Sequence, residues 1–506
     1  MSPKRTSGIL LHPTSLPGPF GIGDLGKHAY HFVDWLHDAK QQLWQVLPLG
    51  PTGYGDSPYQ CFSAFAGNPL LLDLEDLVKR GYLTPDDLAV PIFSRERVDF
   101  GPVITWKMSV LERAFQRFQK NDASASFQAF VTEQQWWLAD YGLFMALKGE
   151  HGGHPWPEWE PALRDRAAGA LAAAREQLKG RIQFHYFLQW LFFEQWLTLK
   201  SYANRKRIRI IGDIPIYVAM DSADAWSQRE SFYFDEQGHP TVIAGVPPDY
   251  FSPTGQLWGN PLYNWERMAA DGYAWWIERF RANLHLYDLV RLDHFRGFYN
   301  YWEVPGDAET AINGRWVDGP REHFFDTVIS ALGELPLIAE DLGEPDPGVY
   351  ELRDHYQFPG MKVLQFAWGS DGADPFLPQN YDKNCIVYTG THDNDTTQGW
   401  YRTAPEKERD YLRRYLRVDG TDIAWDLIRL AMMSCANMAV VPLQDCMNLG
   451  SEARMNTPAV ASGNWTWRFL PHQLSDSIKA GLVEMAELYG RAYVASAERP
   501  TSAHAV

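Results

Sequence analysis

Eight short apolar segments recur along the chain, and the stretches between them are long enough to hold helices. They lie at residues 8–11, 43–47, 208–211, the first half of 288–295, 335–339, 361–367, 385–388 and 438–441. Short apolar runs with polar flanks are typical of buried strands, and strands that alternate with helices favour a parallel sheet. Eight such units predict the α/β class and, within it, a closed (β/α)8 TIM barrel.

The segments between the predicted strands differ greatly in length, which indicates insertions into a single barrel that spans residues 1–506. A helix is expected from about Lys27 to Ala39. Residues 61–206 are expected to form an inserted, mainly helical subdomain, and residues 221–285 an inserted subdomain with a lid loop. Within the latter, residues 244–261 show no periodicity and are rich in aromatic and amide side chains. Long loops of this kind are usually functional, so we interpret this one as a lid that grips a substrate.

Composition excludes several classes of protein. The 506 residues carry a net charge of −17, which argues against nucleic acid as a partner. No apolar leader and no membrane-length apolar run is present, so no membrane partner is expected and the predicted location is the cytoplasm. The four cysteines lie far apart, which makes a zinc site or a disulfide framework a poor interpretation.

Four of the predicted strands end in a carboxylate, namely Asp213, Asp293, Glu340 and Asp393. The carboxyl ends of the strands of such a barrel meet at one rim, where like charges repel each other, so stability alone explains the set poorly. Arg291 lies two residues before Asp293 and, on an extended chain, points to the same side. A cation there is expected to keep the carboxylate ionised.

Two kinds of chemistry use a carboxylate rim: metal-assisted hydrolysis and glycosyl transfer. His294 and His392, beside two of the carboxylates, suit either. The 21 Trp, 24 Tyr and 27 Phe include many in loop-like sequence, where flat rings beside polar groups suit sugars. Arg291 would also compete with a metal ion for Asp293. The Gly-x-Gly-x-x-Gly pattern at residues 21–26 lies in a proline-lengthened loop, so we reject the binding of a nicotinamide dinucleotide.

Several longer motifs, which together cover nearly the whole chain, resemble those of the amylomaltases, the 4-α-glucanotransferases of the α-amylase clan. They stand at residues 54–60, 212–218, 247–261, 291–295, 339–343, 391–395 and 463–465. The resemblance implies a barrel whose insertions form extra subdomains and which has no carboxyl-terminal β-domain. It also implies that no cofactor and no metal is required.

The resemblance further implies a role for each residue that matches a motif. Asp293 would be the nucleophile that forms a covalent glucosyl intermediate, Glu340 the general acid and then base, and Asp393 a stabiliser of the transition state. The implied substrate-binding residues are Tyr54, Tyr59, Asp213, Asp249, Gln256, Trp258, Arg291, His294, Phe366, His392 and Asn464. Among these, Tyr54 is placed either in the cleft or at a remote secondary site.

The expected activity is transfer of α-1,4-glucan segments between maltooligosaccharides, with retention of configuration. Donor and acceptor would be maltooligosaccharides and longer α-1,4-glucans, and the enzyme would act as a monomer or homodimer. Three alternatives stay open at this point: a starch hydrolase of the same clan, a non-catalytic glucan-binding protein, and a metal-dependent barrel hydrolase.

Overall fold

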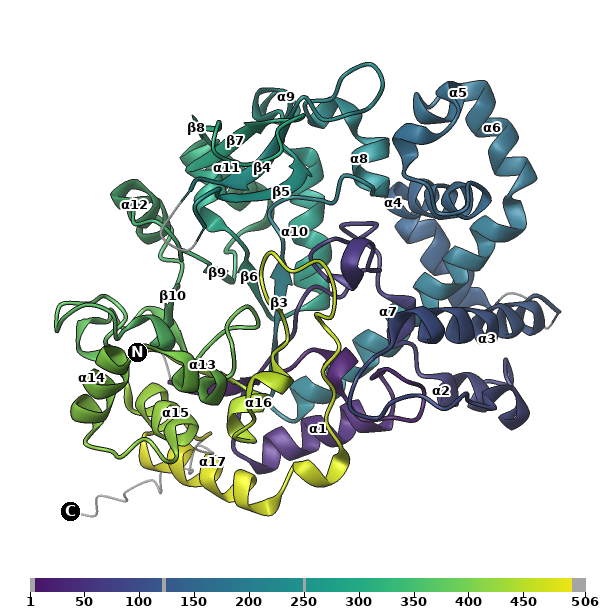
Figure 1. Ribbon diagram of the computed structural model, residues 1–506. Helices are drawn as coiled ribbons and strands as arrows, with labels where there is room; N and C mark the ends of the chain where they lie inside the picture. Colours follow the sequence, from purple (N-terminus) through teal and green to yellow (C-terminus); the bar gives the residue numbers. More distant parts are fainter. Residues whose placement is uncertain (1–4, 121–123, 249–251, 494–506) are drawn as a thin grey trace, which may run out of the picture.

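The computed structural model describes residues 5–120, 124–248 and 252–493 (Figure 1). Eight parallel strands form one sheet in the order β10-β11-β12-β1-β2-β3-β6-β9. They are β1 (Thr6–Leu10), β2 (Leu43–Gln45), β3 (Arg209–Ile214), β6 (Leu289–Leu292), β9 (Leu337–Ala339), β10 (Gly360–Val363), β11 (Cys385–Tyr388) and β12 (Met438–Pro442). Each corresponds to one of the eight apolar segments of the sequence.

The sheet closes on itself through β9 and β10, where the backbone N–H of Ala339 donates to the carbonyl of Pro359 at 2.9 Å. The predicted (β/α)8 barrel is thereby confirmed. Gly8 illustrates how tightly the strands meet, because a Cβ atom at this position would lie only 2.1 Å from the carbonyl oxygen of Leu43 on β2. Only glycine allows this approach.

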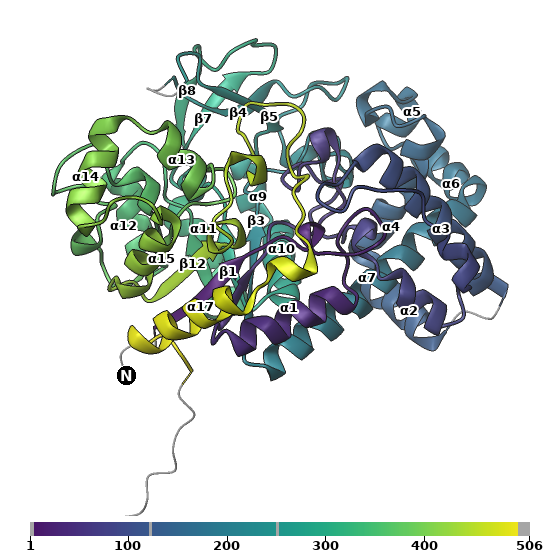
Figure 2. The same cartoon turned by 60° about the horizontal axis from the view of Figure 1, so that its bottom comes forward.

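Helices follow most strands. They include α1 (Lys27–Asp38), α10 (Ala274–Leu286), α11 (Arg321–Leu332), α12 (Pro347–His355), α13 (Thr397–Thr403), α14 (Glu406–Leu416), α15 (Ile423–Met433), α16 (Leu443–Cys446) and α17 (Asp476–Leu488). The helix expected from Lys27 is thus confirmed as α1. Figure 2 shows α17 running along the same side of the molecule as α1.

One connection departs from the expected alternation. Between β10 and β11 the described chain has only 3-10 turns, at Leu364–Phe366 and Pro378–Asn380, and no α-helix. The first turn also shortens the sixth strand, which was expected to reach residue 367. Proline and glycine residues recur through this connection, and both disfavour a continuous helix.

Between β2 and β3 the chain is mainly helical and lies to one side of the barrel (Figure 1). The helices are α2 (Leu74–Lys79), α3 (Phe100–Lys120), α4 (Ala125–Glu150), α5 (Pro161–Arg164), α6 (Ala168–Gln177) and α7 (Lys179–Arg205). Helix α7 packs on β3 and on α10, and Trp196 in α7 is fully buried. The division of the chain into a barrel with inserted subdomains at 61–206 and 221–285 stays a prediction.

The expectation of an aperiodic loop at residues 244–261 is wrong for both ends of that segment. Strands β4 (Val242–Val246) and β5 (Gln256–Pro261) pair there in a second, antiparallel sheet with β7 (Asn300–Pro305) and β8 (Arg315–Asp318), in the order β5-β4-β7-β8. Strand β4 pairs with β7 as well as with β5. Because β7 comes from the next barrel connection, the sequence of residues 244–261 alone gave no sign of this pairing. Two short helices, α8 (Ala223–Ser227) and α9 (Trp265–Ala270), flank these strands.

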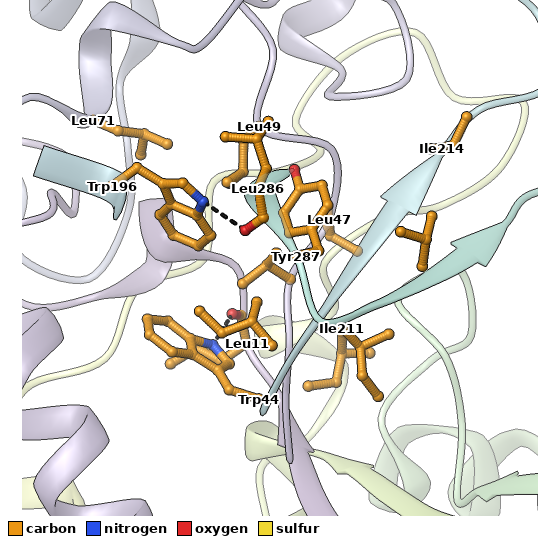
Figure 3. Close-up of a cluster of buried hydrophobic side chains, with 14 of the residues drawn as sticks. Leu11, Trp44, Leu47, Leu49, Leu71, Trp196, Ile211, Ile214, Leu286 and Tyr287 are labelled. Atoms are coloured by element: carbon orange, nitrogen blue, oxygen red, sulfur yellow. Dashed lines mark hydrogen bonds between the residues drawn. The ribbon is translucent and has the colours of Figure 1, made fainter. Parts of the chain in front are cut away.

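A buried apolar cluster holds the barrel to α7 and α10 (Figure 3). Trp44 on β2 and Trp196 on α7 are both fully buried, and each indole also forms a hydrogen bond. Trp44 Nε1 donates to the carbonyl of Leu11 at 2.8 Å, and Trp196 Nε1 donates to that of Leu286 at 3.0 Å. Large aromatic rings bury much apolar surface, and their N–H groups are satisfied here. These contacts therefore fix the positions of the barrel strands and of their ends.

Candidate active site

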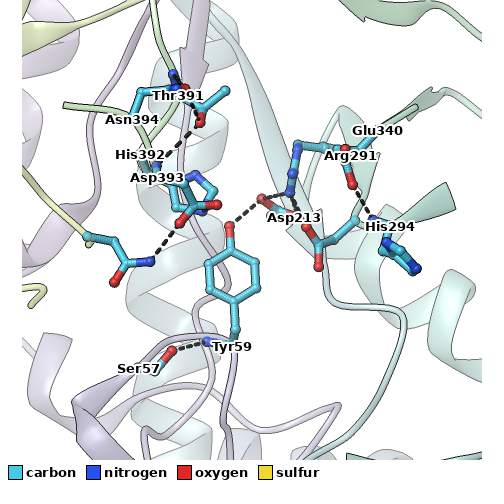
Figure 4. Close-up of polar contacts among 12 residues, drawn as sticks. Ser57, Tyr59, Asp213, Arg291, His294, Glu340, Thr391, His392, Asp393 and Asn394 are labelled. Carbon is cyan, nitrogen blue, oxygen red and sulfur yellow. Dashed lines mark hydrogen bonds and ion pairs between the residues drawn. The ribbon is translucent and has the colours of Figure 1, made fainter. Parts of the chain in front are cut away.

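Four carboxylates lie on one rim of the barrel. Asp213 belongs to β3, Asp293 and Glu340 directly follow β6 and β9, and Asp393 lies in the turn after β11. Strands β3 and β6 pair in the register that sets Asp213 opposite Arg291. Figure 4 shows side chains from these separate strands gathered around the hydroxyl group of Tyr59.

Arg291 is the cation at the centre of the rim. Its Nη1 lies 2.8 Å from Asp213 Oδ2 and 2.9 Å from Asp293 Oδ1, so one guanidinium nitrogen pairs with both carboxylates. Burial disfavours the charge, but the two carboxylates outweigh it and raise the pKa of Arg291 well above its usual value. The arginine therefore stays charged, and its contact with Asp293 is the ion pair that the Arg-x-Asp spacing predicted.

Asp213 has no exposed side-chain surface. Tyr59 donates its hydroxyl to Asp213 Oδ2 at 2.9 Å. Burial raises the pKa of Asp213 to about 6 even though Arg291 pulls it down, so the group is still largely ionised at neutral pH. With all its contacts directed to protein groups, Asp213 can organise the rim but has no open oxygen with which to attack a substrate.

Glu340 is a buried carboxyl group held by the backbone. Its Oε2 accepts the N–H of His294 at 2.7 Å, and its Oε1 accepts the N–H of Leu342 at 3.0 Å. His294 has left-handed backbone angles, φ 50° and ψ 53°, which non-glycine residues seldom adopt. Burial raises the pKa of Glu340 to about 7, and the nearby charge of Asp293 adds to this against the opposing effect of Arg291. Near neutral pH this group can both give and take a proton.

Asp393 has different surroundings. His392 Nε2 lies 3.2 Å from Asp393 Oδ2, and Asn456 Nδ2 donates to Oδ1 at 2.6 Å. Burial opposes the charged form, yet His392 and the hydrogen bonds from His392 and Asn456 place the pKa of Asp393 below its usual value. The side chain keeps 45% of its surface exposed. Asp393 is therefore an ionised carboxylate that a ligand can reach.

Aromatic rings flank the polar groups. The ring of His392 stacks on Tyr59 with centroids 5.1 Å apart and 13° between the planes, and Trp465 lies 5.9 Å from both rings. On the opposite side, Trp258 meets His294 edge to face at 4.8 Å. Burial lowers the pKa of His294 to about 4, so this imidazole is neutral at neutral pH. Flat rings beside hydrogen-bonding groups are the surfaces that sugar rings need.

Gln256 and Trp258 both lie on β5, where the Trp258 indole donates to Gln256 Oε1 at 3.3 Å. The second sheet thus carries predicted binding residues to His294, the residue that follows Asp293. This contact places β5 beside the rim.

Not every predicted site residue has a described contact with the carboxylates. Phe366 is 43% exposed and packs on Phe376. Tyr54 is 78% exposed at a short 3-10 turn. Asn464 holds its own loop, accepting the N–H of Thr457 at 2.9 Å. Asp249 lies outside the described residues.

Three residues that we did not predict complete the site. Asn456 and Trp465 contact Asp393 and His392 as described above, and Arg454 Nη2 donates to the carbonyl of Asp393 at 2.7 Å. All three come from the chain after β12, just before or within the motif at residues 463–465. Their polar and aromatic side chains beside that motif are the only signal in the sequence that could have pointed to them.

The described residues contain no group of three or more His, Cys, Asp and Glu side chains arranged to hold a metal ion. The four cysteines are free thiols. In the same part of the chain, no helix combines the length and the apolar surface that a membrane crossing requires.

The fold and the site together define a class. The rim joins a carboxylate paired with arginine, a carboxyl group with a pKa near neutrality and an ionised carboxylate beside His392, whose ring stacks on Tyr59. Such a rim suits reactions at glycosidic bonds. Two carboxyl groups with such different environments are what reactions at glycosidic bonds require. Comparisons with known proteins agree with this class.

The family described as 4-alpha-glucanotransferase, glycoside hydrolase family 77, matches residues 11–473. A 4-alpha-glucanotransferase of Thermus thermophilus is 52% identical over 498 residues, covering 96% of this chain and 99% of that one. One from Synechocystis sp. is 52% identical over 499 residues, covering 97% and 99%. The solved structure of amylomaltase from Streptococcus agalactiae in complex with acarbose matches with a TM-score of 0.95 at 40% identity, covering 97% of this chain and 100% of that chain.

The chain belongs to glycoside hydrolase family 77, the 4-alpha-glucanotransferases. The resemblance to the amylomaltases that the sequence motifs indicated is thereby confirmed.

Proposed function

We propose that this site transfers α-1,4-glucan segments between maltooligosaccharides by double displacement with retention of configuration. The observation that carries the proposal is the pair of carboxyl groups on neighbouring strands β6 and β9. Asp293 is bound to a permanent cation, Arg291, whereas Glu340 is buried with a pKa of about 7. One group suits a nucleophile and the other an acid and base.

In the first half of the reaction, Asp293 attacks the anomeric carbon of the donor while the glycosidic bond breaks. Protonated Glu340 gives its proton to the departing oxygen, so the released sugar leaves with a neutral hydroxyl. The product is a covalent glucosyl ester on Asp293. Retaining enzymes of this kind hold the two carboxyl groups roughly 5–5.5 Å apart, and we expect that separation here.

In the second half, the 4-hydroxyl of an acceptor glucan attacks the ester. Glu340, now ionised, takes the proton of that hydroxyl, and Asp293 leaves as a carboxylate. Both groups return to their starting states. A pKa near 7 suits this double duty because the group changes protonation easily in both directions.

The remaining polar groups would bind the sugar at the cleaved bond. Asp393 and His392 would hydrogen-bond its hydroxyls, and the charge of Asp393 would stabilise the oxocarbenium-like transition state. Tyr59, Trp258 and His294 would surround the same sugar, while Asp213 and Arg291 keep the rim in place. Gln256, Phe366, Asn464, Tyr54 and Asp249 would contact more distant glucose units.

Transfer rather than hydrolysis requires that a sugar hydroxyl reaches the ester before water does. Strand β5, with Trp258, flanks the rim, and so does the loop that Asn464 holds. Together they would limit the access of water. Aromatic acceptor subsites would then place the incoming hydroxyl.

The first experiment is incubation of the purified protein with maltotriose, with products resolved by size and total reducing ends counted separately. We expect glucose and a ladder of longer maltodextrins at constant reducing ends. Rising reducing ends would make the protein a hydrolase. No change in the substrate would point to a binding protein, and loss of activity in a chelator would point to a metal-dependent enzyme.

The nucleophile is tested by Asp293→Asn, which preserves size and removes the charge. We expect turnover of maltotriose to fall at least about a thousandfold, while the protein stays folded and still binds the sugar. Comparable activity of the variant and the parent enzyme would assign the nucleophile to another group.

Location and assembly stay predictions. We expect a cytoplasmic enzyme that acts on maltodextrins derived from starch or glycogen, and a monomer or homodimer in solution. Cell fractionation and sedimentation of the purified protein check these two points.

A further inference from the structure

Asp445 is a buried acidic residue to which the mechanism above gives no task. It lies in α16, directly after β12, and only 1% of it is exposed. Strand β12 is the neighbour of β11, so Asp445 lies beside the chain that follows β11. A buried carboxyl group is costly unless other groups satisfy its oxygens, so its partners show what it holds.

The two oxygens of Asp445 accept three hydrogen bonds from two threonines. Oδ2 accepts the hydroxyl of Thr389 at 2.5 Å and the hydroxyl of Thr397 at 2.7 Å. Oδ1 accepts the backbone N–H of Thr397 at 2.7 Å. Both threonines are fully buried, so water cannot replace a bond that is lost.

The two threonines mark the two ends of one turn. Thr389 is the first residue after β11, and Thr397 is the first residue of α13. The chain between them carries His392 and Asp393. One side chain from the neighbouring strand end therefore ties the beginning of this turn to its end.

The position of Asp393 depends on this turn. Asn394 closes the turn locally, because its Oδ1 accepts the N–H of Thr391 at 2.9 Å (Figure 4). Asp393 itself meets Asn456, whose Nδ2 donates to Oδ1 at 2.6 Å. Groups on turns are placed less precisely than groups on strands, and a displacement of about 1 Å can cost about a hundredfold in rate. The ends of the turn therefore need a fixed support.

We propose that Asp445 is a positioning residue for Asp393: by binding Thr389 and Thr397 at the two ends of the turn, it holds the Asp393 carboxylate where the transition state requires it. The inference rests on the proposed role of Asp393 in the transition state. Asp445 is buried behind the turn, so it acts through the two threonines and not on the sugar.

The mildest test changes Thr389 alone. Thr389→Val has nearly the same shape but no hydroxyl, so it removes the hydrogen bond at the strand end of the turn. For maltotriose disproportionation we expect kcat to fall about five- to tenfold with KM within about twofold, because Asp393 acts mainly in the transition state. Thr389→Ser keeps the hydroxyl and should restore kcat to within about twofold of the parent enzyme. Equal kcat of the two variants would overturn the proposal.

A double-mutant cycle separates the positioning of Asp393 from general damage. With α-maltosyl fluoride, an activated donor, Asp445→Ala should lower kcat about thirty- to hundredfold. In an Asp393→Ala background the same change should alter kcat by less than about twofold, because no carboxylate is left to position. An equal fold-change in both backgrounds would refute the proposal. If Asp445→Ala does not fold, Thr389→Val takes its place in the cycle and the same criterion holds.

Asp288→Ala is the matched control for Asp445→Ala. Asp288 Oδ2 also accepts a backbone N–H, that of Ile210 at 2.7 Å, and a side-chain donor, Asn204 Nδ2 at 2.8 Å, but it lies at the opposite end of the barrel. Both changes should lower the free energy of unfolding, whereas only Asp445→Ala should lower kcat per folded molecule. A matching fall of kcat in Asp288→Ala would attribute the loss to stability and contradict the role of Asp445.

Failure of the proposed function has a different signature. If the parent enzyme does not disproportionate maltotriose, or if Asp393→Ala keeps the full kcat, the proposed function or the role of Asp393 fails, and this inference fails with it. An active parent enzyme and an impaired Asp393→Ala, together with unaffected Asp445 and Thr389 variants, would refute only the role of Asp445.

Discussion

In the proposed mechanism Glu340 is protonated in one half of the reaction and ionised in the other, and its burial provides the intermediate pKa of about 7. In the free enzyme, attack on a donor needs the protonated form. We therefore expect kcat/KM for maltotriose to fall as pH rises through about 7. With α-maltosyl fluoride, whose leaving group needs no proton, this alkaline fall should be absent.

The same reasoning predicts the behaviour of Glu340→Gln. Loss of the acid should lower activity on maltotriose by about a hundred- to ten-thousandfold, while release of fluoride from α-maltosyl fluoride in the first turnover is largely kept. Rapid-mixing measurements of fluoride release check this. If both donors lost activity equally, Glu340 would not be the general acid.

Asn456 is one of the three site residues that the sequence did not predict. Its amide donates to Asp393 Oδ1 at 2.6 Å. Asn456→Ala leaves that oxygen without its donor, so we expect kcat/KM for maltotriose to fall about five- to thirtyfold, equivalent to about 1–2 kcal/mol.

Asn204 provides the matched control for Asn456. Its amide donates to Asp288 Oδ2 at 2.8 Å just before β6, at the opposite end of the barrel from the rim. Asn204→Ala removes the same kind of hydrogen bond and should leave activity unchanged. If both alanine variants lost activity to the same extent, the loss would reflect stability rather than contact with Asp393.

The sequence could predict Asp213, Asp293 and Glu340 because each directly ends an apolar run, and parallel strands bring such ends to one rim. Nothing comparable marks Asn456. Asn456 contacts Asp393, which lies more than sixty positions away in the sequence. Such contacts exist only once the barrel is closed.

At the scale of elements, strands were predictable where one short segment carries its own signal. The barrel strands are buried on both faces and read as continuous apolar runs. Strand β5 lacks this signal, since it contains glycine, asparagine and proline and is only partly buried. Strand β4 is apolar, but its partner β7 lies far away in the sequence. The second sheet forms because β7, from another connection, pairs with β4, which in turn pairs with β5. The absence of a helix between β10 and β11 in the described chain has a local cause, because the glycine and proline residues of this connection disfavour a helix.

Helices α7 and α10 are joined by one buried tryptophan. Trp196 is fully buried, and its Nε1 donates to the carbonyl of Leu286, the last residue of α10, where helical carbonyls have no partner of their own. Trp196→Ala should lower the free energy of unfolding by about 3–5 kcal/mol, and Trp196→Phe should lower it less. Urea unfolding measures both.

Activity distinguishes this structural role from a catalytic one. Per folded molecule at low temperature, kcat of both Trp196 variants should equal that of the parent enzyme, because Trp196 has no described contact with the rim. A fall in kcat without a change in the free energy of unfolding would contradict the structural role of Trp196.

For the molecule as a whole, the barrel allows acidic groups to be buried together at one rim, and this arrangement affects stability. In the unfolded chain a glutamate has a pKa near 4.5, whereas burial raises the pKa of Glu340 to about 7 in the folded protein. The folded state therefore binds the proton more tightly. The stability contributed by Glu340 is fully present below about pH 4.5 and is lost as pH rises through about 7.

Glu340→Gln removes this titration while keeping the shape of the side chain. We expect the free energy of unfolding of the parent enzyme, relative to that of the variant, to decrease by about 3 kcal/mol between pH 4.5 and pH 8. Parallel urea titrations of the two proteins across that range, with the difference taken at each pH, cancel the contributions of all other groups. A difference that stays constant, or that grows with pH, would mean that the folded enzyme does not hold the proton of Glu340 and that another group supplies the acid. The expected result would show that this fold gives up stability near neutral pH to keep a carboxylic acid protonated where the glycosidic bond breaks.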